Sequence, residues 1–188
     1  MSLEDPGTAG WTLQVAHTSQ VDTLVLAAAR ALLDEAFGGD FTDFDWEHAL
    51  GGIHALAWDE GELVGHGAVV QRRLVHGGRA LRTGYVEGVA VRADRQGLKH
   101  GLEIMTALQD VVRLSYELGA LSSTEAALGF YEHLGWELWR GPTSALTPDG
   151  LVRTPDDDGS VHVLRLDGGP DLDLDGPLTC DWRDGALW

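Results

Sequence analysis

The sequence is poor in the residues that secreted and membrane proteins need. Cys180 is the single cysteine of the 188 residues, so no disulfide can form within the chain, as is usual in a reducing compartment. No base adjoins Cys180 in the sequence, and we expect a packed thiol rather than a nucleophile. No apolar run approaches the ~20 residues of a membrane span. The acidic start lacks the apolar segment of a signal peptide. These absences predict a soluble cytoplasmic protein.

Positive charge is also scarce. Thirteen Lys and Arg stand against thirty Asp and Glu, a formal net charge of −17. Such a surface repels nucleic acids and anionic membranes and attracts polycations, so we expect no nucleic-acid or membrane partner. The charge is explained equally by a well-solvated surface or by an acidic cleft for a polyamine. From Asp149 onward the chain carries ten Asp and no Glu or Lys, which adds weight to the cleft.

Metal-ligand patterns are lacking as well. Residues 171–176 begin like a calcium loop, but Trp182 stands where a bidentate glutamate is required. The eight histidines show no metal-binding spacing, and scattered surface or core positions are expected for them. We predict no metal.

Apolar periodicity and turn residues predict one domain over residues 1–188, with a flexible lead at 1–10 and an acidic loop at 167–177. Asp22 and Thr42 are predicted helix caps, and Gly119 is predicted to close the main helix. The expected order through Trp139 is β-α-α-β-β-β-α-β-α-β, with strands at 11–18, 51–58, 63–75, 79–91, 120–123 and 136–139, and helices at 23–37, 43–50, 101–118 and 124–133. Two further strands are expected near 144–146 and 161–166.

The most informative stretch runs from Tyr85 to Gly101. It begins as a strand whose alternation slips at Glu87-Gly88, where a glycine indicates a β-bulge. The strand leads through a loop containing Lys99 and His100 into a helix. A strand, a glycine-containing basic loop and a helix N-terminus together favour diphosphate binding.

These residues resemble the acyl-coenzyme A loop of the GNAT N-acetyltransferases, which reads Arg/Gln-x-x-Gly-x-Gly/Ala. Gln96 and Gly101 fit this pattern, and Lys99 takes the place of the first glycine. From about Val15 to Trp188 the chain further resembles the aminoglycoside 2'-N-acetyltransferases of actinobacteria, a branch that tolerates a basic residue at this place. The segments that carry this resemblance are 39–41, 45–48, 85–94, 118–123, 141–144, 154–159 and 180–183.

The resemblance implies an α/β (α+β) GNAT fold, with a mixed, mostly antiparallel sheet flanked by helices. It also implies acetyl-CoA as co-substrate, a cationic aminoglycoside as acceptor and a homodimer. The donor-binding residues would be those of the strand and loop: Val89, Ala90, Val91, Gln96, Gly97, Leu98, Lys99, His100 and Gly101.

Acetyl transfer to an amine needs a base, donors for the thioester oxygen and a proton for the leaving thiolate. Glu87 is our predicted base, acting through a water, and it is also expected to contact the sugar; the rival interpretation is a plain strand carboxylate. Gly88 would let the backbone splay, so that the Val89 N–H reaches the thioester carbonyl. Tyr131 matches the GNAT tyrosine that faces the coenzyme A sulfur, and a core tyrosine is the rival.

By resemblance, Asp40, Ser122, Asp156 and Asp157 contact the drug, together with Glu87 and Gly88. Each of the first four is also a natural turn or cap residue. The terminal carboxylate of Trp188 is expected to bind an ammonium group. The family can carry an Asp two residues before this tryptophan, where this chain has Ala186.

Two rival functions stay open. The acceptor could be another polycationic amine, such as a polyamine, a peptide or a cell-wall amino sugar. Alternatively, the chain could bind an acyl-coenzyme A or a drug without turnover.

Overall fold

The computed structural model describes residues 10–97 and 99–188, so most of the predicted lead and Leu98 lie outside the described residues. The chain forms two compact units. The first comprises residues 1–70 and 87–110, and the second residues 71–86 and 111–188. Strands β3 (Glu62–His76) and β4 (Arg79–Val91) and helix α3 (His100–Ser115) contribute residues to both units.

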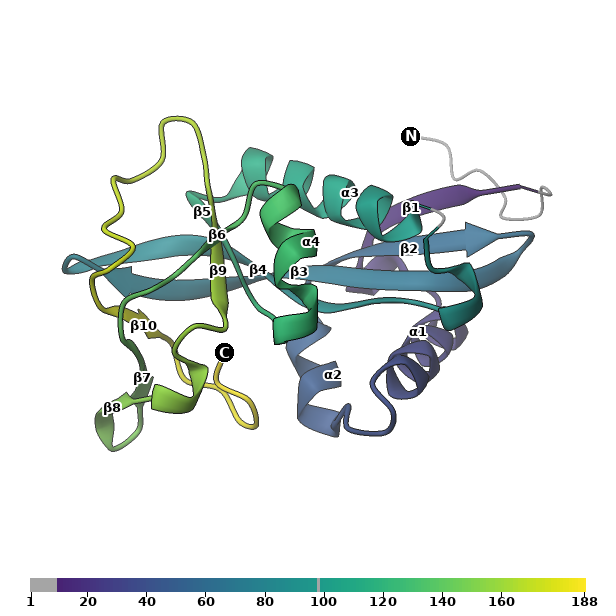
Figure 1. Ribbon diagram of the computed structural model, residues 1–188. Coiled ribbons are helices and arrows are strands. Elements are labelled where there is room, and N and C mark those ends of the chain that lie inside the picture. Colours follow the sequence, from purple (N-terminus) through teal and green to yellow (C-terminus); the bar gives the residue numbers. More distant parts are fainter. Residues whose placement is uncertain (1–9, 98) are drawn as a thin grey trace. The chain divides into compact units, whose positions relative to one another are not determined.

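The first unit is built on antiparallel strands β1 (Thr12–His17) and β2 (Ile53–Asp59), with β2 also antiparallel to β3. Helix α3 packs on one face, because Gly65 and Gly67 leave room for its Ile104 and Leu108 side chains. Helices α1 (Thr23–Ala36) and α2 (Asp43–Ala49) belong to the other face, as Figure 1 shows. Short 3-10 helices occupy Thr18–Gln20 and Ala93–Arg95.

Both helix starts in the first unit follow the predicted caps. The Asp22 carboxylate accepts the Leu24 N–H at 2.8 Å. Thr42 and Asp45 form a capping box, each accepting from the other's backbone N–H. These local signals explain why the predicted helix starts are confirmed.

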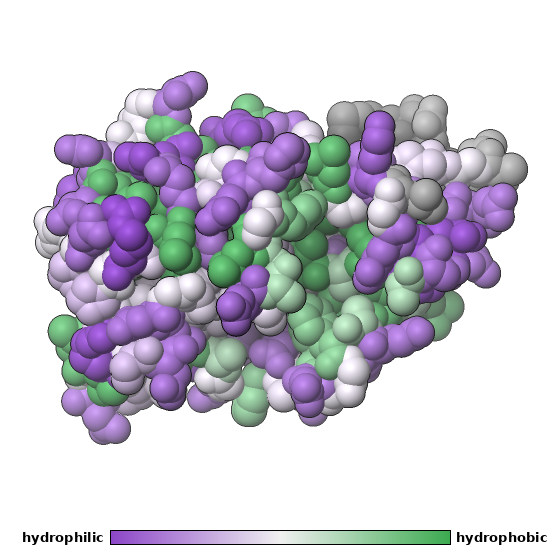
Figure 2. Space-filling model, viewed as in Figure 1, coloured by the Kyte–Doolittle hydropathy of each residue, from purple (hydrophilic) through white to green (hydrophobic). Residues whose placement is uncertain are grey.

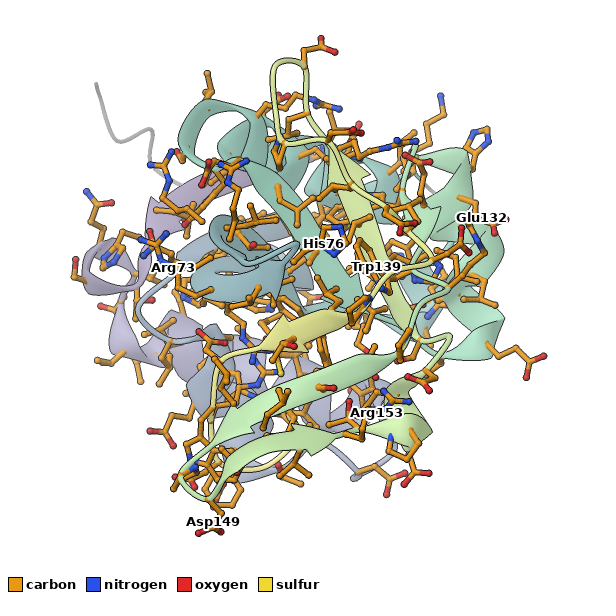
Figure 3. All side chains as sticks on the ribbon, turned by 90° about the vertical axis from the view of Figure 1, so that its left-hand side faces the viewer. Arg73, His76, Glu132, Trp139, Asp149 and Arg153 are labelled. Carbon is orange, nitrogen blue, oxygen red and sulfur yellow. The ribbon has the colours of Figure 1, made fainter. Side chains whose placement is uncertain are left out.

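The second unit contains a mixed, mostly antiparallel sheet with the order β6-β9-β5-β4-β3-β10-β7-β8. The β4–β5 and β7–β10 pairs are parallel, whereas the β3–β10, β5–β9, β6–β9 and β7–β8 pairs are antiparallel. Figure 3 views this part of the molecule, where the rings of His76 and Trp139 meet edge to face at 4.9 Å. Its strands are β5 (Leu118–Ser122), β6 (Glu137–Leu138), β7 (Thr143–Thr147), β8 (Gly150–Arg153), β9 (Val161–Arg165) and β10 (Leu178–Cys180).

The helical part of the second unit is small. Helix α4 (Leu128–His133) follows the 3-10 helix Glu125–Ala127, and another 3-10 helix spans Pro155–Asp157. Residues 167–177 form turns without helix or strand, as predicted for the acidic loop. Strands β8 and β10 were not predicted.

The prediction that Gly119 ends the main helix is wrong. Helix α3 ends at Ser115, and Gly119 lies inside β5. A Cβ at Gly119 would stand 2.9 Å from the Leu164 Cβ and 3.1 Å from atoms of Trp136 and Val112. The glycine is therefore required for close packing in a strand, a role whose sequence signal resembles that of a helix C′ residue.

The molecular surface is mixed in polarity. Hydrophilic residues cover much of the face drawn in Figure 2, with smaller hydrophobic areas among them. Individual apolar side chains such as Leu24 and Leu114 are exposed. Among the described residues, no helix has the length and apolar character needed to cross a membrane.

Candidate functional site

Gly88, where the sequence predicts a bulge, lies within β4 in the first unit. Gly88 has φ +55°, a left-handed conformation that glycine adopts without strain. A Cβ at this position would lie 3.3 Å from the Leu33 Cδ1 atom and 3.6 Å from the His66 ring. Glu87 and Val89, on either side of Gly88, are half-buried, whereas Ala90 is buried against Leu32 and Leu33. The left-handed residue of β4 therefore lies where the sequence predicts contact with both substrates.

The loop after β4 contains two residues in the left-handed backbone conformation. Gly97 has φ +78° and Lys99 φ +68°, so Lys99 adopts the left-handed conformation for which the family motif supplies glycine. The Gln96 side chain donates to the Val91 carbonyl at 3.1 Å, which ties the loop to the strand. Gly101 lies in the first turn of α3, where N–H groups lack partners within the helix.

His100 opens α3 and is 8% exposed. Its ring stacks on Trp11, with centroids 4.0 Å apart and planes 16° apart. Neither ring nitrogen has a hydrogen-bond partner among residues 10–97 and 99–188. A buried polar atom without a partner is costly, so this ring is suited to a ligand that accepts a hydrogen bond.

Asp40 is far from Gly88 in the sequence. It follows α1 in a turn where Gly38 and Gly39 both have positive φ. Its N–H donates to the Phe37 carbonyl at 3.2 Å, and its carboxylate is exposed. The turn can therefore present a charge to a cationic ligand.

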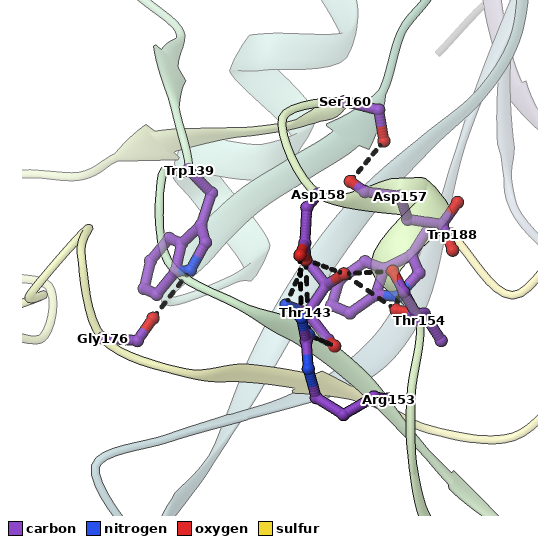
Figure 4. A network of polar contacts seen from close by, with 9 residues as sticks. All are labelled: Trp139, Thr143, Arg153, Thr154, Asp157, Asp158, Ser160, Gly176 and Trp188. Atoms are coloured by element: carbon purple, nitrogen blue, oxygen red, sulfur yellow. Dashed lines mark hydrogen bonds and ion pairs between the residues drawn. The ribbon is translucent and has the colours of Figure 1, made fainter.

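A polar network in the second unit contains the predicted drug contacts Asp157 and Trp188 (Figure 4), and Ser122 joins it through Ser160. The Ser122 hydroxyl donates to Ser160 at 3.1 Å, and the Ser160 hydroxyl donates to the Asp157 carbonyl oxygen at 2.8 Å. The Trp188 indole N–H donates to the Thr154 hydroxyl at 2.9 Å. Because the Asp157 N–H donates to the Thr154 carbonyl oxygen at 3.0 Å, the chain end and Asp157 share Thr154 as a neighbour.

Charge in this network is concentrated on three consecutive aspartates. Burial, followed by the charges of Asp156 and Asp158, raises the pKa of the Asp157 carboxyl. Asp158 instead pairs with Arg153 at 2.7 Å and accepts the Thr143 N–H at 2.8 Å. Chiefly the hydrogen bond from Arg153 lowers the Asp158 pKa to about 2. Asp156 is exposed, so an approaching cation meets two carboxylates without an arginine partner in the described residues.

Tyr131 lies on α4 with 9% of its surface exposed. Its ring packs near those of Phe130, Trp136 and His162. Burial raises the pKa of the phenol to about 12, so the hydroxyl stays protonated at neutral pH and can donate. The packing fits a core tyrosine, and the retained proton fits the predicted acid.

Two histidines that the sequence did not pair are in contact in the first unit. The rings of His54 (β2) and His66 (β3) are fully buried, with centroids 5.2 Å apart. In the strand register Leu56 pairs with His66 and His54 with Ala68, which makes the histidines diagonal neighbours on one face. Their spacing along the chain contains no signal for this contact; only the register reveals it.

Burial is the first cause that lowers the pKa of each histidine, to about 4 for both. A positive charge on His17 lowers the His54 pKa further, and a charge on His54 lowers that of His66. The hydrogen bond with the Gly88 carbonyl opposes the shift of His66. Both rings are therefore neutral near pH 7.

This pair predicts an acid-sensitive fold. Between pH 6.5 and about 4 the unfolded chain binds more protons than the folded one, so the free energy of unfolding should fall by a few kcal/mol with decreasing pH. Denaturant unfolding at a series of pH values checks this. A flat curve across this window would contradict the neutral pair.

Cys180 is the packed thiol that the sequence predicts. It is fully buried, and its Sγ lies 3.5 Å from the Leu187 carbonyl oxygen. Burial raises the pKa of the thiol to about 11, which leaves it protonated and unreactive at neutral pH. Among the described residues no cluster of three His, Cys, Asp or Glu could hold a metal ion.

The fold and the loop define an acetyltransferase of the GNAT class. The acetyltransferase (GNAT) domain family matches residues 22–139. A GNAT family N-acetyltransferase (YhbS) from Escherichia coli, solved in complex with CoA, is similar with a TM-score of 0.62 and 18% identity, over 95% of this chain and 93% of that one. A GNAT family acetyltransferase from Brucella melitensis, in complex with acetyl-CoA, has a TM-score of 0.57 and 17% identity, over 86% and 92%.

A sequence relative narrows the class. An aminoglycoside 2'-N-acetyltransferase from Mycolicibacterium fortuitum is 50% identical over 179 residues, which cover 94% of this chain and 92% of that protein. The chain therefore belongs to the aminoglycoside 2'-N-acetyltransferases of the GNAT family. The predicted fold class and enzyme class are confirmed.

Proposed function

We propose that this chain transfers the acetyl group of acetyl-CoA directly to the 2'-amine of an aminoglycoside within a ternary complex. This acetylation confers resistance to the drug. The 50% identity with the Mycolicibacterium fortuitum enzyme over almost the whole chain carries this proposal. The roles of single residues are argued below from the contacts within each unit.

For the donor, the proposed site is the end of β4 and the loop that follows, from Val89 through Gly101. The left-handed backbone of Gly97 and Lys99 and the N-terminus of α3 suit the diphosphate. The unpartnered nitrogens of the buried His100 ring supply a further donor to it. The edge of β4 near Val89, Ala90 and Val91 is assigned to the pantetheine arm.

Lys99 offers a test that separates backbone shape from charge. Lys99→Gly should relieve left-handed strain and raise stability by up to ~1 kcal/mol, and it should raise the KM for acetyl-CoA several-fold by removing a charge beside the diphosphate. Lys99→Gln should raise KM equally without the gain in stability. Denaturation curves and KM at two salt concentrations measure both effects. A KM unchanged in both variants would place the diphosphate elsewhere.

For the acceptor, the proposed contacts are Asp40, Glu87 and Gly88 in the first unit and Ser122, Asp156, Asp157 and the Trp188 carboxylate in the second. Carboxylates that face a polycation are strong partners when partly desolvated. The net charge of −17 should speed the encounter and make it weaken with salt.

The chemical step needs two side chains and one N–H group. Glu87 accepts a proton from the substrate ammonium through a water, the freed amine nitrogen attacks the thioester carbon, and the Val89 N–H stabilises the oxyanion. As the C–S bond breaks, Tyr131 donates its proton to the thiolate, and the attacking nitrogen releases its second proton, which returns through solvent to the phenolate. The products are the amide and free coenzyme A.

A thiol-release assay with acetyl-CoA tests the function. The test compares two aminoglycosides that are identical except for an amine or a hydroxyl at the 2' position. Thiol should be released only with the drug that carries the 2'-amine. Release with both drugs, or with a simple polyamine alone, would favour an acetyltransferase for another polycation, which the acidic surface also suits. Thermal stabilisation by both ligands without release would favour a binding protein.

We further propose that the enzyme acts as a cytoplasmic homodimer that binds neither nucleic acid nor membranes. The support is the resemblance to enzymes that are often dimers, together with the acidic charge and the single buried cysteine. Light scattering of the purified chain measures its mass in solution.

A further inference from the structure

The buried pair His54 and His66 belongs to a chain of hydrogen bonds that ends at the Gly88 carbonyl in β4. The His66 Nδ1 atom is 2.7 Å from the Gly88 carbonyl oxygen. Its Nε2 atom is 2.9 Å from the His54 Nδ1 atom, and the His54 Nε2 atom is 2.8 Å from the Thr18 hydroxyl. All four residues belong to the first unit.

The direction of each bond follows from the acceptor at the end. A carbonyl oxygen can only accept, so His66 carries its proton on Nδ1 and donates to Gly88. Because the ring is neutral, its Nε2 atom accepts, and His54 must also carry its proton on Nδ1. The Nε2 atom of His54 then accepts from the Thr18 hydroxyl at 2.8 Å, a shorter contact than the 3.2 Å from this hydroxyl to the Gly52 carbonyl oxygen. Thr18 itself accepts the Gly51 N–H at 2.9 Å. One set of tautomers satisfies every member.

The far end of this chain decides the orientation of one peptide group. The Gly88 carbonyl and the Val89 N–H belong to the same peptide bond, which is planar and trans. Fixing the carbonyl toward His66 therefore fixes the N–H in the opposite direction. With φ +55° at Gly88 and Leu33 close by, no side chain at that residue could provide this restraint instead.

The Trp46 ring packs against both histidines of the pair. Its ring centroid lies 6.4 Å from that of His54 and 6.0 Å from that of His66. Because both histidines are fully buried, water does not compete for the Gly88 carbonyl from this side.

We propose that His66, held by His54 and Thr18, is a positioning residue that aims the Val89 N–H at the thioester oxygen. The proposal rests on the function proposed above. It assigns His66 no contact with substrate, because the ring acts through the Gly88–Val89 peptide group.

Asparagine and glutamine at position 66 would each reproduce one of the two ring nitrogens of the histidine. In His66→Asn the amide nitrogen replaces Nδ1 and can donate to Gly88, whereas in His66→Gln the amide reaches the position of Nε2 and contacts only His54. We expect His66→Gln to lower kcat by about 10²-fold, because a misaimed oxyanion donor is nearly a lost one. His66→Asn should stay within about fivefold of the wild type. The KM for acetyl-CoA should change little in either variant.

Stability separates positioning from simple structural damage. Each variant loses one buried hydrogen bond of the chain, so both should lower the midpoint of denaturant unfolding by a similar amount. Similar stability with unequal kcat supports the proposal. Equal kcat in the two folded variants would overturn it.

Nuclear magnetic resonance supplies a test that needs no turnover. The ¹⁵N shifts of the wild-type imidazoles should show the proton on Nδ1 of both His54 and His66, and a proton on Nε2 of His66 would refute the proposal. The Val89 amide and Gly88 carbonyl shifts should move in His66→Gln and hold in His66→Asn. If the wild type releases no thiol, the proposed function fails, while these shifts still decide whether His66 orients the peptide group.

Discussion

Replacing Tyr131 by Phe should lower kcat by about 10²-fold or more while the KM values change little. The substitution removes the proposed proton donor to the thiolate and leaves the buried ring in place among Phe130, Trp136 and His162. Because burial raises the pKa of the phenol to about 12, the wild-type rate should show no tyrosine ionisation below about pH 11. In steady-state kinetics from pH 6 to 10, the kcat of Tyr131→Phe should therefore be lower than that of the wild type at every pH. The shape of the two pH profiles should be the same.

The chain supplies a matched control for this variant. Tyr116 follows α3, is half-buried and is one of three tyrosines in the sequence. Tyr116→Phe deletes the same hydroxyl and should leave kcat unchanged. If Tyr131→Phe keeps kcat within about threefold of the wild type, the thiolate leaves without help from this residue, and Tyr131 is the core tyrosine of the rival interpretation.

Local chemistry explains which elements could be predicted. Asp22 and Thr42 cap their helices through contacts with residues two and three positions away, so a short window of sequence holds the whole signal. The turn at Glu60-Gly61 has positive φ at both residues, as a two-residue hairpin turn requires. Strand β10 is only three residues long and pairs with β3 more than a hundred residues earlier. Nothing near it in the sequence indicates that partner.

The same limit applies to the candidate site. Gly88 can be detected in the sequence because its left-handed backbone conformation favours glycine. The loop at Lys99 can be detected because Lys99 stands where the family motif has a glycine, and it adopts the same left-handed conformation. The contact between His54 and His66 depends on the register of β2 and β3, which no spacing rule encodes. Asp158 is indistinguishable in sequence from Asp156 and Asp157, yet only Asp158 pairs with Arg153.

The C-terminal segment shows a third case, in which one buried arginine organises residues far along the chain. Arg72 lies on β3 and is 4% exposed. Its guanidinium donates to the Asp181 carboxylate at 2.8 Å, to the Asp181 carbonyl at 2.9 Å and to the Leu187 carbonyl at 2.8 Å. It also lies over the Tyr85 ring, 4.7 Å from the centroid. The Arg72 side chain therefore holds Asp181 and Leu187, and with them the segment that leads to Trp188.

Arg72→Met should destabilise the fold by roughly 2–4 kcal/mol, because it removes a buried ion pair and leaves two carbonyls without their donor. It should also raise the KM for the aminoglycoside, since the Trp188 carboxylate loses its fixed position. Arg72→Lys should fail similarly, because one ammonium cannot reproduce the planar fork that reaches three oxygens. Denaturant unfolding and steady-state kinetics measure the two effects.

The neighbouring arginine provides the comparison. Arg73 is exposed on the opposite face of β3, and its backbone N–H, which a substitution retains, donates to Asp181 at 3.0 Å. Arg73→Met should therefore change stability and KM little. A double-mutant cycle between Arg72→Met and Asp181→Asn isolates their pairwise coupling, which should reach about 1 kcal/mol or more for a partly buried pair. If Arg72→Met destabilises the fold while the aminoglycoside KM stays unchanged, the chain end contributes to folding alone, and the terminal carboxylate is not the ammonium site proposed here.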